Sequence, residues 1–192
     1  FEVDICQLGK DQRAANMVAR EVGPKLGFWK PIAVHHHLLQ GLAKPTTWPL
    51  PSDEKERREI IASVKMSKSK PESAIFVIDS DEEIRKKIRS AYCPPRTIEN
   101  NPIMGIAKYI VFARPKVKLY IDRKPEYGGP IEVYSYEELE KLYVEGKLHP
   151  LDLKNAIAEE LVKIIKPVRE ALLSDPKTRE DLMLIIEKKI TR

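Results

Sequence analysis

The chain has 192 residues, 33% of them charged and 42% hydrophobic, with a formal net charge of +5. This composition fits a folded protein of one large or two small domains, and its fifteen prolines and many charged residues suit a hot environment. Two cysteines without CxxC spacing argue against a disulfide scaffold or a zinc finger. The sequence shows neither a signal peptide nor an apolar run of the ~18 residues that a membrane span needs, so we expect a cytoplasmic protein without a membrane partner.

The first part of the chain predicts a strand, a helix and a second strand. Residues 1–7 alternate apolar and polar side chains, as half-buried strands do, and Asp11 can cap a helix that ends at Val22 before Gly23-Pro24. The second strand is predicted over Pro31–His37. Such a unit is typical of parallel α/β sheets of the Rossmann kind, in which ligands bind at the carboxyl ends of the strands.

The next segment predicts a charged helix from Ser52 to Ala62 and a strand over Ala74–Ile78. A helix over Asp81–Ala91 follows, because Ser80 and Glu83 have the spacing of a capping box. The Cys93-Pro-Pro95 segment then predicts a boundary between one domain over residues 1–92 and another over residues 93–192.

The second domain is predicted to be mainly helical, with a small β-hairpin. By sequence, its elements are a helix over Pro102–Phe112, strands over Lys116–Asp122 and Pro130–Tyr134, and helices over Ser135–Gly146, Pro150–Leu173 and Asp175–Ile190. An apolar stripe near a period of 3.6 predicts one buried face on the long helix. The stripe consists of Leu151, Ala158, Leu161, Ile164, Ile165 and Val168.

A lysine-rich run carries the most specific chemistry in the sequence. Residues 65–69 read Lys-Met-Ser-Lys-Ser, with two lysines three positions apart and two interleaved hydroxyls. Such a cationic loop suits the charge that builds on a triphosphate when its α-phosphorus is attacked. Taken alone, the same residues also suit a solvent-exposed loop.

The lysine run resembles the signature of class I aminoacyl-tRNA synthetases, and four further segments are similar to the tyrosyl-tRNA synthetases of archaea and eukaryotes. These segments are residues 7–12, Asn100–Ile103, Tyr127–Gly129 and His149–Asn155. The resemblance runs from Asp4 to about Leu172. It implies an enzyme that activates tyrosine with ATP, in the presence of Mg²⁺, and transfers it to tRNA(Tyr), and a full-length protein that is a homodimer.

The resemblance assigns the lysine run to the phosphates of ATP. Lys65 and Lys68 would stabilise the departing pyrophosphate, and Ser67 and Ser69 would add hydrogen-bond donors. The backbone of Met66 would lie against adenine.

The turn after the first strand would bind the rest of both substrates. Gly9 would let the ribose approach the backbone, and Asp11 would accept hydrogen bonds from its hydroxyls. Gln12 would bind the amino group of tyrosine. Read without the resemblance, Asp11 is a helix cap. The family often has a second glycine where Leu8 stands.

Further residues would contact tRNA. Arg13 and Met17 match a helix that faces the acceptor stem, although they also fit a solvated arginine and a core methionine. Asp152 resembles the carboxylate that accepts hydrogen bonds from the first anticodon base, Tyr127 an aromatic residue that stacks on it, and His149 is a further candidate. Without the resemblance, Asp152 compensates a helix terminus and Tyr127 covers the hairpin.

The three consecutive histidines at positions 35–37 do not predict a metal site. Neighbouring strand residues point to opposite faces, so at most His35 and His37 converge, and no cluster of carboxylates or thiols lies near them in the sequence. We therefore expect no metal bound by protein side chains.

We interpret the chain as the C-terminal part of such a synthetase, an α/β protein. It would comprise the second half of a Rossmann-type catalytic domain and a mainly helical anticodon-binding domain, and would be inactive alone because the tyrosine pocket lies elsewhere. A tryptophanyl-tRNA synthetase, which shares the turn and the lysine run, and a non-catalytic tRNA-binding protein remain alternatives. The sequence predicts no role for the last helix.

Overall fold

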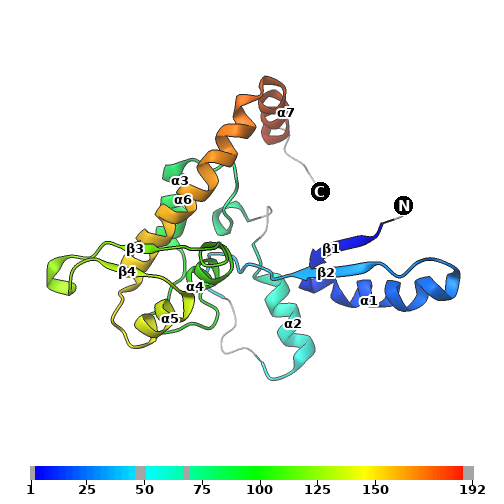
Figure 1. Cartoon of the computed structure of the whole chain (residues 1–192), viewed down its shortest axis with the longest axis horizontal. Helices are drawn as coiled ribbons and strands as arrows, with labels where there is room; N and C mark the ends of the chain where they lie inside the picture. Colours follow the sequence, from blue (N-terminus) through cyan, green and yellow to red (C-terminus); the bar gives the residue numbers. More distant parts are fainter. Residues whose placement is uncertain (1–2, 46–50, 67–69, 188–192) are drawn as a thin grey trace.

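Two parallel strands and a helix form the first unit of the fold. The structure, a computed structural model, describes residues 3–45, 51–66 and 70–187 (Figure 1). Strand β1 (Ile5–Gly9) pairs in parallel with β2 (Ile32–His36), in the register Ile5↔Ile32 to Gly9↔His36. The connection consists of η1 (Lys10–Gln12), α1 (Arg13–Val22) and η2 (Gly23–Leu26). The predicted order and parallel pairing are confirmed, and β1 extends two residues beyond its predicted end.

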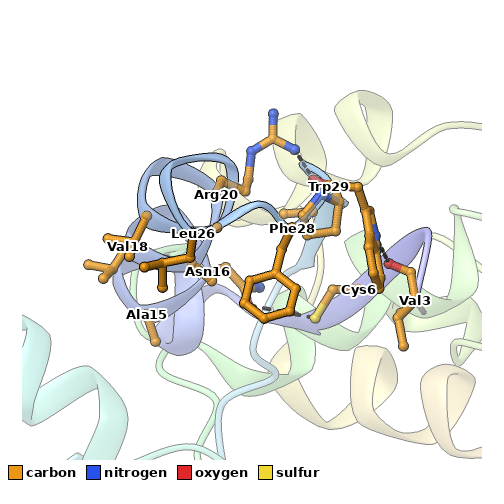
Figure 2. A pocket seen from close by; sticks show the side chains of 14 residues that line it. Val3, Cys6, Ala15, Asn16, Val18, Arg20, Leu26, Phe28 and Trp29 are labelled. Atoms are coloured by element: carbon orange, nitrogen blue, oxygen red, sulfur yellow. Dashed lines mark hydrogen bonds between the residues drawn. The ribbon is translucent and has the colours of Figure 1, made fainter. Parts of the chain in front are cut away.

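The two faces of this small sheet are only partly covered by the described residues. Ile5, Ile32 and Val34 share one face by register and alternation, and they are 59%, 59% and 45% exposed. On the other face, α1 and the loop after it enclose an apolar groove of about 630 Å³. Figure 2 shows Phe28 and Trp29 beside this groove.

Between β2 and α3 (Asp81–Ser90), the prediction of a strand over residues 74–78 is wrong. Helix α2 (Glu54–Ser63) is present, but the later residues form η3 (Pro71–Ser73) and then a closed turn. In that turn the Phe76 amide donates to Asp79 Oδ2 at 2.9 Å, and the Asp79 amide donates to the Phe76 carbonyl at 3.1 Å. These bonds occupy the backbone groups that a strand needs for its partner.

Helices α3 (Asp81–Ser90) and α6 (Pro150–Ser174) pack together in the helical body of the molecule. The capping box predicted for α3 is confirmed: the Glu83 amide donates to Ser80 Oγ, and Glu83 Oε2 accepts from the Ser80 amide. The core contains fully buried residues of both helices: Ile84, Ile88, Leu153 and Ile157. The boundary at Cys93 stays a prediction; α3, which precedes it, packs on α6, which follows it.

The predicted apolar stripe of α6 is correct only in part. Leu151 and Val168 are 40% and 49% exposed, because they lie on either side of the part of α6 that α3, α4 (Pro102–Ile106) and β3 (Leu119–Ile121) cover. No residue of α6 after Val162 is buried, although Arg169 still binds Asp81 at the start of α3, and the helix leads on to α7 (Pro176–Glu187) (Figure 1). The buried residues of α6 are Leu153, Ala156, Ile157, Ala158, Glu160, Leu161 and Val162.

The other predicted elements of the second half are present with slightly different bounds. Helix α4 and the π-helical turn η4 replace the single helix predicted from Pro102, and β3 and β4 form the expected antiparallel hairpin. The bounds are α4 (Pro102–Ile106), η4 (Ala107–Val111), β3 (Leu119–Ile121), η5 (Pro125–Tyr127), β4 (Ile131–Val133), α5 (Tyr136–Val144) and α7 (Pro176–Glu187). Within the described ranges, no helix is both long and apolar enough to cross a membrane.

Candidate functional site

The start of the lysine run lies at the carboxyl ends of β1 and β2. The Met66 amide donates to the Leu39 carbonyl at 3.0 Å, and the Gly41 amide donates to the Val64 carbonyl at 2.7 Å. Between these bonds, Lys65 and Gln40 form an antiparallel bridge. The chain beyond β2 therefore fixes the backbone of Lys65 at the sheet edge where α/β proteins bind their ligands.

Asp11 comes to the same place from the end of β1. Lys65 Nζ donates to Asp11 Oδ2 at 2.7 Å, with the two side chains 40% and 19% exposed. This hydrogen bond lowers the pKa of the Asp11 carboxyl below its ordinary value. The structure thus brings together two residues that are 54 positions apart in the sequence.

The alternative role of Asp11 as a helix cap is not what the structure shows. The N-cap of α1 is Gln12, and its side chain makes no capping hydrogen bond with the described residues. Asp11 lies one residue earlier, in η1, and its carboxylate binds Lys65 instead.

Gly9 allows this close approach. A Cβ at Gly9 would lie 2.6 Å from Asp11 Oδ1 and 2.7 Å from Leu38 Cδ2, both too near for a real contact. The backbone of Gly9 is in the extended region, so the requirement is for space rather than for an unusual conformation.

The remaining residues predicted for the nucleotide end are partly described. Gln12 is exposed beside Asp11, and Met66 is half-buried and packs against the core. Arg13 is exposed and Met17 half-buried, one turn apart on α1. Ser67, Lys68 and Ser69 lie outside the described residues.

Asn100 and Asn101, next to this site, belong to a motif in the sequence, and the structure shows the contact that each of them makes. Asn101 is the N-cap of α4: its Oδ1 accepts from the amides of Ile103 and Met104, and its Nδ2 donates to the Thr97 carbonyl at 2.9 Å. The carbonyl of Asn100 accepts from Gln40 Nε2 at 3.1 Å. Gln40, the bridge partner of Lys65, therefore connects the carboxyl end of the sheet to the helical body.

The histidines at positions 35–37 have separate partners. His35 Nε2 lies 3.1 Å from Asn16 Nδ2 on α1, whereas the ring of His37 stacks on Tyr109 with the centroids 3.8 Å apart. Burial lowers the pKa of His37, and the charges of Lys10 and Lys108 act in the same direction. Within the described part of the chain, no group of three or more potential ligands could hold a metal ion.

A second pocket collects the residues predicted to read the anticodon. Tyr127, His149 and Asp152 all line a cavity of about 550 Å³ between the hairpin and the start of α6. The Tyr127 residue is 64% exposed, so it does not cover the hairpin. His149 is the N-cap of α6, with Nδ1 accepting from the Leu151 amide at 3.2 Å. Asp152 is half-buried in the first turn, and its carboxylate accepts no hydrogen bond from the described residues.

Two arginines of this pocket were missed in the sequence. Arg123 donates from Nε to the Gly129 carbonyl at 2.9 Å and from Nη1 to the Lys147 carbonyl at 2.8 Å, which ties the Tyr127 turn to the segment before α6. Arg96 lies against Gly146 from the other side. No local motif marks either residue, because both contacts depend on how the hairpin and α5 fold back on each other.

Comparison with known proteins agrees with this arrangement. The family of tRNA synthetases class I (W and Y) matches residues 57–166. A tyrosine–tRNA ligase of Aeropyrum pernix is 50% identical over the whole chain, which covers 52% of that protein. The chain thus spans about half the length of the curated relatives it matches.

Solved structures give the same result. The crystal structure of tyrosyl-tRNA synthetase from Pyrococcus horikoshii complexed with L-tyrosine matches 93% of this chain and 50% of that one, with a TM-score of 0.83 and 44% identity. A tryptophanyl-tRNA synthetase from Aeropyrum pernix matches with a TM-score of 0.59 and 17% identity, which shows a shared fold only. The resemblance predicted from the sequence is confirmed, and since the family match covers more than half of its residues, the chain belongs to the class I tRNA synthetases of the tryptophan and tyrosine family.

Proposed function

We propose that the chain is the part of a tyrosine–tRNA ligase that binds ATP and recognises the anticodon of tRNA(Tyr). The observation that carries this proposal is the 2.7 Å contact between Lys65 and Asp11. It joins the start of the lysine run to the turn after β1, at the sheet edge where a nucleotide is expected. The 50% identity to a tyrosine–tRNA ligase supports tyrosine as the amino acid.

The proposed architecture is a Rossmann-type catalytic domain, of which residues 1–92 form one part, followed by an anticodon-binding domain over residues 93–192. The parallel pairing of β1 and β2 supports a Rossmann sheet. So do the exposed Ile5, Ile32 and Val34, because parallel sheets are normally covered on both faces. In the complete protein, other segments would supply further strands and this cover.

The first step would be attack of the tyrosine carboxylate on the α-phosphorus of ATP, which gives tyrosyl-adenylate and releases pyrophosphate. In the arrangement seen here, Lys65 and Asp11 satisfy each other. On ATP binding, Asp11 would exchange this partner for the ribose hydroxyls, and the freed Lys65 ammonium would turn to the phosphates. Catalysis would come from positioning and charge stabilisation, without a covalent enzyme intermediate. Lys68, Ser67 and Ser69 would add to the same phosphate site.

Other substrate contacts follow from the resemblance and stay predictions. Gly9 would leave room for the ribose, Met66 would place its backbone against adenine, and Gln12 would bind the tyrosine amino group. Mg²⁺ would accompany the triphosphate. The homodimer and the cytoplasmic location are likewise expected from the family.

The second step transfers the tyrosyl group to the terminal adenosine of tRNA, which requires recognition of the tRNA. Tyr127 is exposed, and in the same cavity the Asp152 carboxylate has no hydrogen-bond partner among the described residues. A base could therefore stack on the ring and donate its N–H groups to the carboxylate. A guanine as first anticodon base has such donors. His149 lies beside them, and Arg13 and Met17 would meet the acceptor stem.

Exchange of pyrophosphate into ATP by the full-length protein tests the proposal, with tyrosine and tryptophan compared. Exchange that depends on tyrosine supports the proposed function. Exchange with tryptophan would instead identify a tryptophanyl enzyme. Binding of tRNA without exchange would identify a non-catalytic tRNA-binding protein.

A further inference from the structure

Arg96 occupies an unusual backbone conformation at the rim of the second pocket. Its φ of 58° lies in the left-handed region, which residues other than glycine adopt at a cost in free energy. Such conformations persist where the surrounding structure holds them, and they are concentrated at ligand sites. The left-handed conformation therefore makes Arg96 a candidate for a residue that binds a ligand.

The side chain of Arg96 is held against the end of α5. A Cβ at Gly146 would lie 2.7 Å from Arg96 Nη2 and 2.8 Å from Arg96 Cζ, so the guanidinium rests where any other residue would place its side chain. Gly146 has a φ of 75°, as expected for the residue that ends a helix, and its amide donates to the Tyr143 carbonyl. Glycine at position 146 thus allows the backbone conformation at the helix end and leaves space for the side chain of Arg96.

Although it lies against Gly146, the guanidinium has no hydrogen bond or ion pair with any described residue. The other cations of the pocket are occupied: Arg123 donates to two carbonyls, and Lys147 pairs with Glu145 at 2.7 Å. Arg96 is also exposed. Its guanidinium therefore offers N–H donors to a ligand in the cavity that Arg96 lines.

The cavity combines this guanidinium with the carboxylate of Asp152, and neither has a partner among the described residues. Arg96 and Asp152 line the same space without pairing to each other, and the exposed ring of Tyr127 lines it as well. A nucleotide matches all three, because it offers a base for the ring and the carboxylate and an anionic phosphate for the guanidinium. The planar fork of arginine fits two phosphate oxygens at once.

We propose that Arg96 binds a backbone phosphate of the RNA nucleotide whose base lies between Tyr127 and Asp152. This inference rests on the proposed function of the pocket as the anticodon site. Arg96 would fix the position of the strand, whereas Asp152 would select the base, since phosphate contacts carry no sequence information.

The test measures binding of the chain to an anticodon stem-loop of tRNA(Tyr) by fluorescence anisotropy at several salt concentrations. A second RNA carries a different first anticodon base. Arg96→Ala should weaken binding of both RNAs about equally, roughly tenfold at low salt, as for loss of one charge-assisted contact. It should also reduce the slope of log K against log salt by about 0.7, the value for one phosphate of a single strand.

Three variants separate this role from others. Asp152→Ala should leave the salt slope unchanged and reduce the preference between the two RNAs. Arg96→Lys should retain most of the salt slope but lose part of the affinity, because the ammonium lacks the fork. Arg179→Ala removes the same charge from an exposed position of α7 and should bind as the unsubstituted chain does.

The unfolding midpoint of each variant shows whether it remains folded. An Arg96→Ala chain that is folded, yet binds both RNAs with the original slope and affinity, would overturn the inference while leaving the anticodon pocket intact. If Arg96→Ala abolished the preference between the two RNAs and left the salt slope unchanged, the inference would also be overturned, because Arg96 would then contact the base. If the unsubstituted chain bound neither RNA, the proposed anticodon function would fail together with this inference.

Discussion

At the scale of single residues, the contact between Lys65 and Asp11 joins two motifs that the sequence shows only separately, the lysine run and the turn after β1. The residue types and the motifs were visible in the sequence, but their contact was not, because it depends on the parallel pairing of β1 and β2 and on the bridge between Gln40 and Lys65. The structure also excludes one reading of Asp11: the carboxylate binds Lys65 and does not cap α1.

The lowered pKa of Asp11 has a defined consequence for stability. A carboxyl whose pKa is lower in the folded state stabilises the fold above its unfolded pKa, and this contribution is lost as the pH falls through the folded pKa. Asp11 is therefore ionised at neutral pH, in an ion pair with Lys65. Since Lys65 is 40% exposed, solvent screens the pair and its contribution to the free energy of unfolding is small.

Lys65→Ala tests the proposed catalytic role of Lys65 in the full-length protein. We expect pyrophosphate exchange to slow by about two orders of magnitude, because the proposed role makes Lys65 a preorganised charge that stabilises the leaving pyrophosphate. The loss should appear mainly in kcat, since that charge grows in the transition state. Steady-state exchange kinetics at saturating ATP and tyrosine measure it.

Lys177→Ala is the matched control for this experiment. Lys177 is exposed on α7 and has no ion pair with the described residues, so its removal should leave exchange unchanged. Exchange by Lys65→Ala at the rate of the Lys177→Ala protein would show that the lysine run does not act on the phosphates.

At the scale of elements, signals within a short stretch of sequence predicted the structure well, and apolar runs alone did not. Ser80 and Glu83 form the predicted capping box, because both partners lie within one turn. The apolar run over residues 74–78 predicts a strand, but the hydrogen bond between the Phe76 amide and Asp79 closes this segment into a turn. The side chain of Ile75 packs against the core without strand pairing. A short buried run has no period that separates these outcomes.

The long helix shows the same limit in another form. Its period was correctly read as helical, but how far along the helix burial extends is set by α3, α4 and β3, which are remote in sequence. Leu151 lies before the buried residues of α6 and Val168 lies after them, and both are exposed although they continue the apolar pattern. The sequence predicts the face of a helix, whereas tertiary packing decides how much of that face is covered.

Asn101→Ala tests the element that links the site to the helical body. Asn101 is 3% exposed and caps α4, and the amides it serves belong to the fully buried Ile103 and Met104. Loss of an N-cap costs about 0.5–2 kcal/mol of the free energy of unfolding. We expect a value at or above the upper end, since these buried donors cannot turn to water. Urea unfolding of the chain measures it.

Asp53→Ala provides the comparison, because it removes an N-cap at an exposed helix start. Asp53 Oδ1 accepts from the Glu56 amide at 2.8 Å, where water can replace the lost bond. Its cost should therefore fall near the lower end of the range. Equal costs for the two variants would contradict the view that burial makes the Asn101 cap important.

At the scale of the whole molecule, the chain has one well-covered core and one poorly covered sheet. The core residues extend from Leu42 to Val162 and lie mostly in the helical body, whereas β1 and β2 project from it with α1 (Figure 1). The motifs of the sequence indicated a Rossmann unit, but the uncovered state of its sheet is visible only in three dimensions. It agrees with a chain that spans about half the length of its relatives.

The apolar groove beside α1 should therefore be accessible in this chain and covered in the full-length protein. We expect an apolar fluorescent dye to bind the chain at this groove of about 630 Å³, since Phe28 is 62% exposed and Val18 is 60% exposed on its rim. Val18→Asp should lower the dye fluorescence by placing a charge at the groove. Titration of the dye against the chain, its variant and the full-length protein measures the effect.

Met183→Asp is the control for this titration, because Met183 is 51% exposed on α7 and does not line the groove. Its dye binding should equal that of the unsubstituted chain. The full-length protein should bind much less dye than the chain, because the segments that complete a parallel sheet bury both of its faces. The chain and the full-length protein could instead bind equal amounts of dye, with Val18→Asp lowering the dye fluorescence of both. This outcome would mean that the groove stays open and that the sheet is not completed at this face.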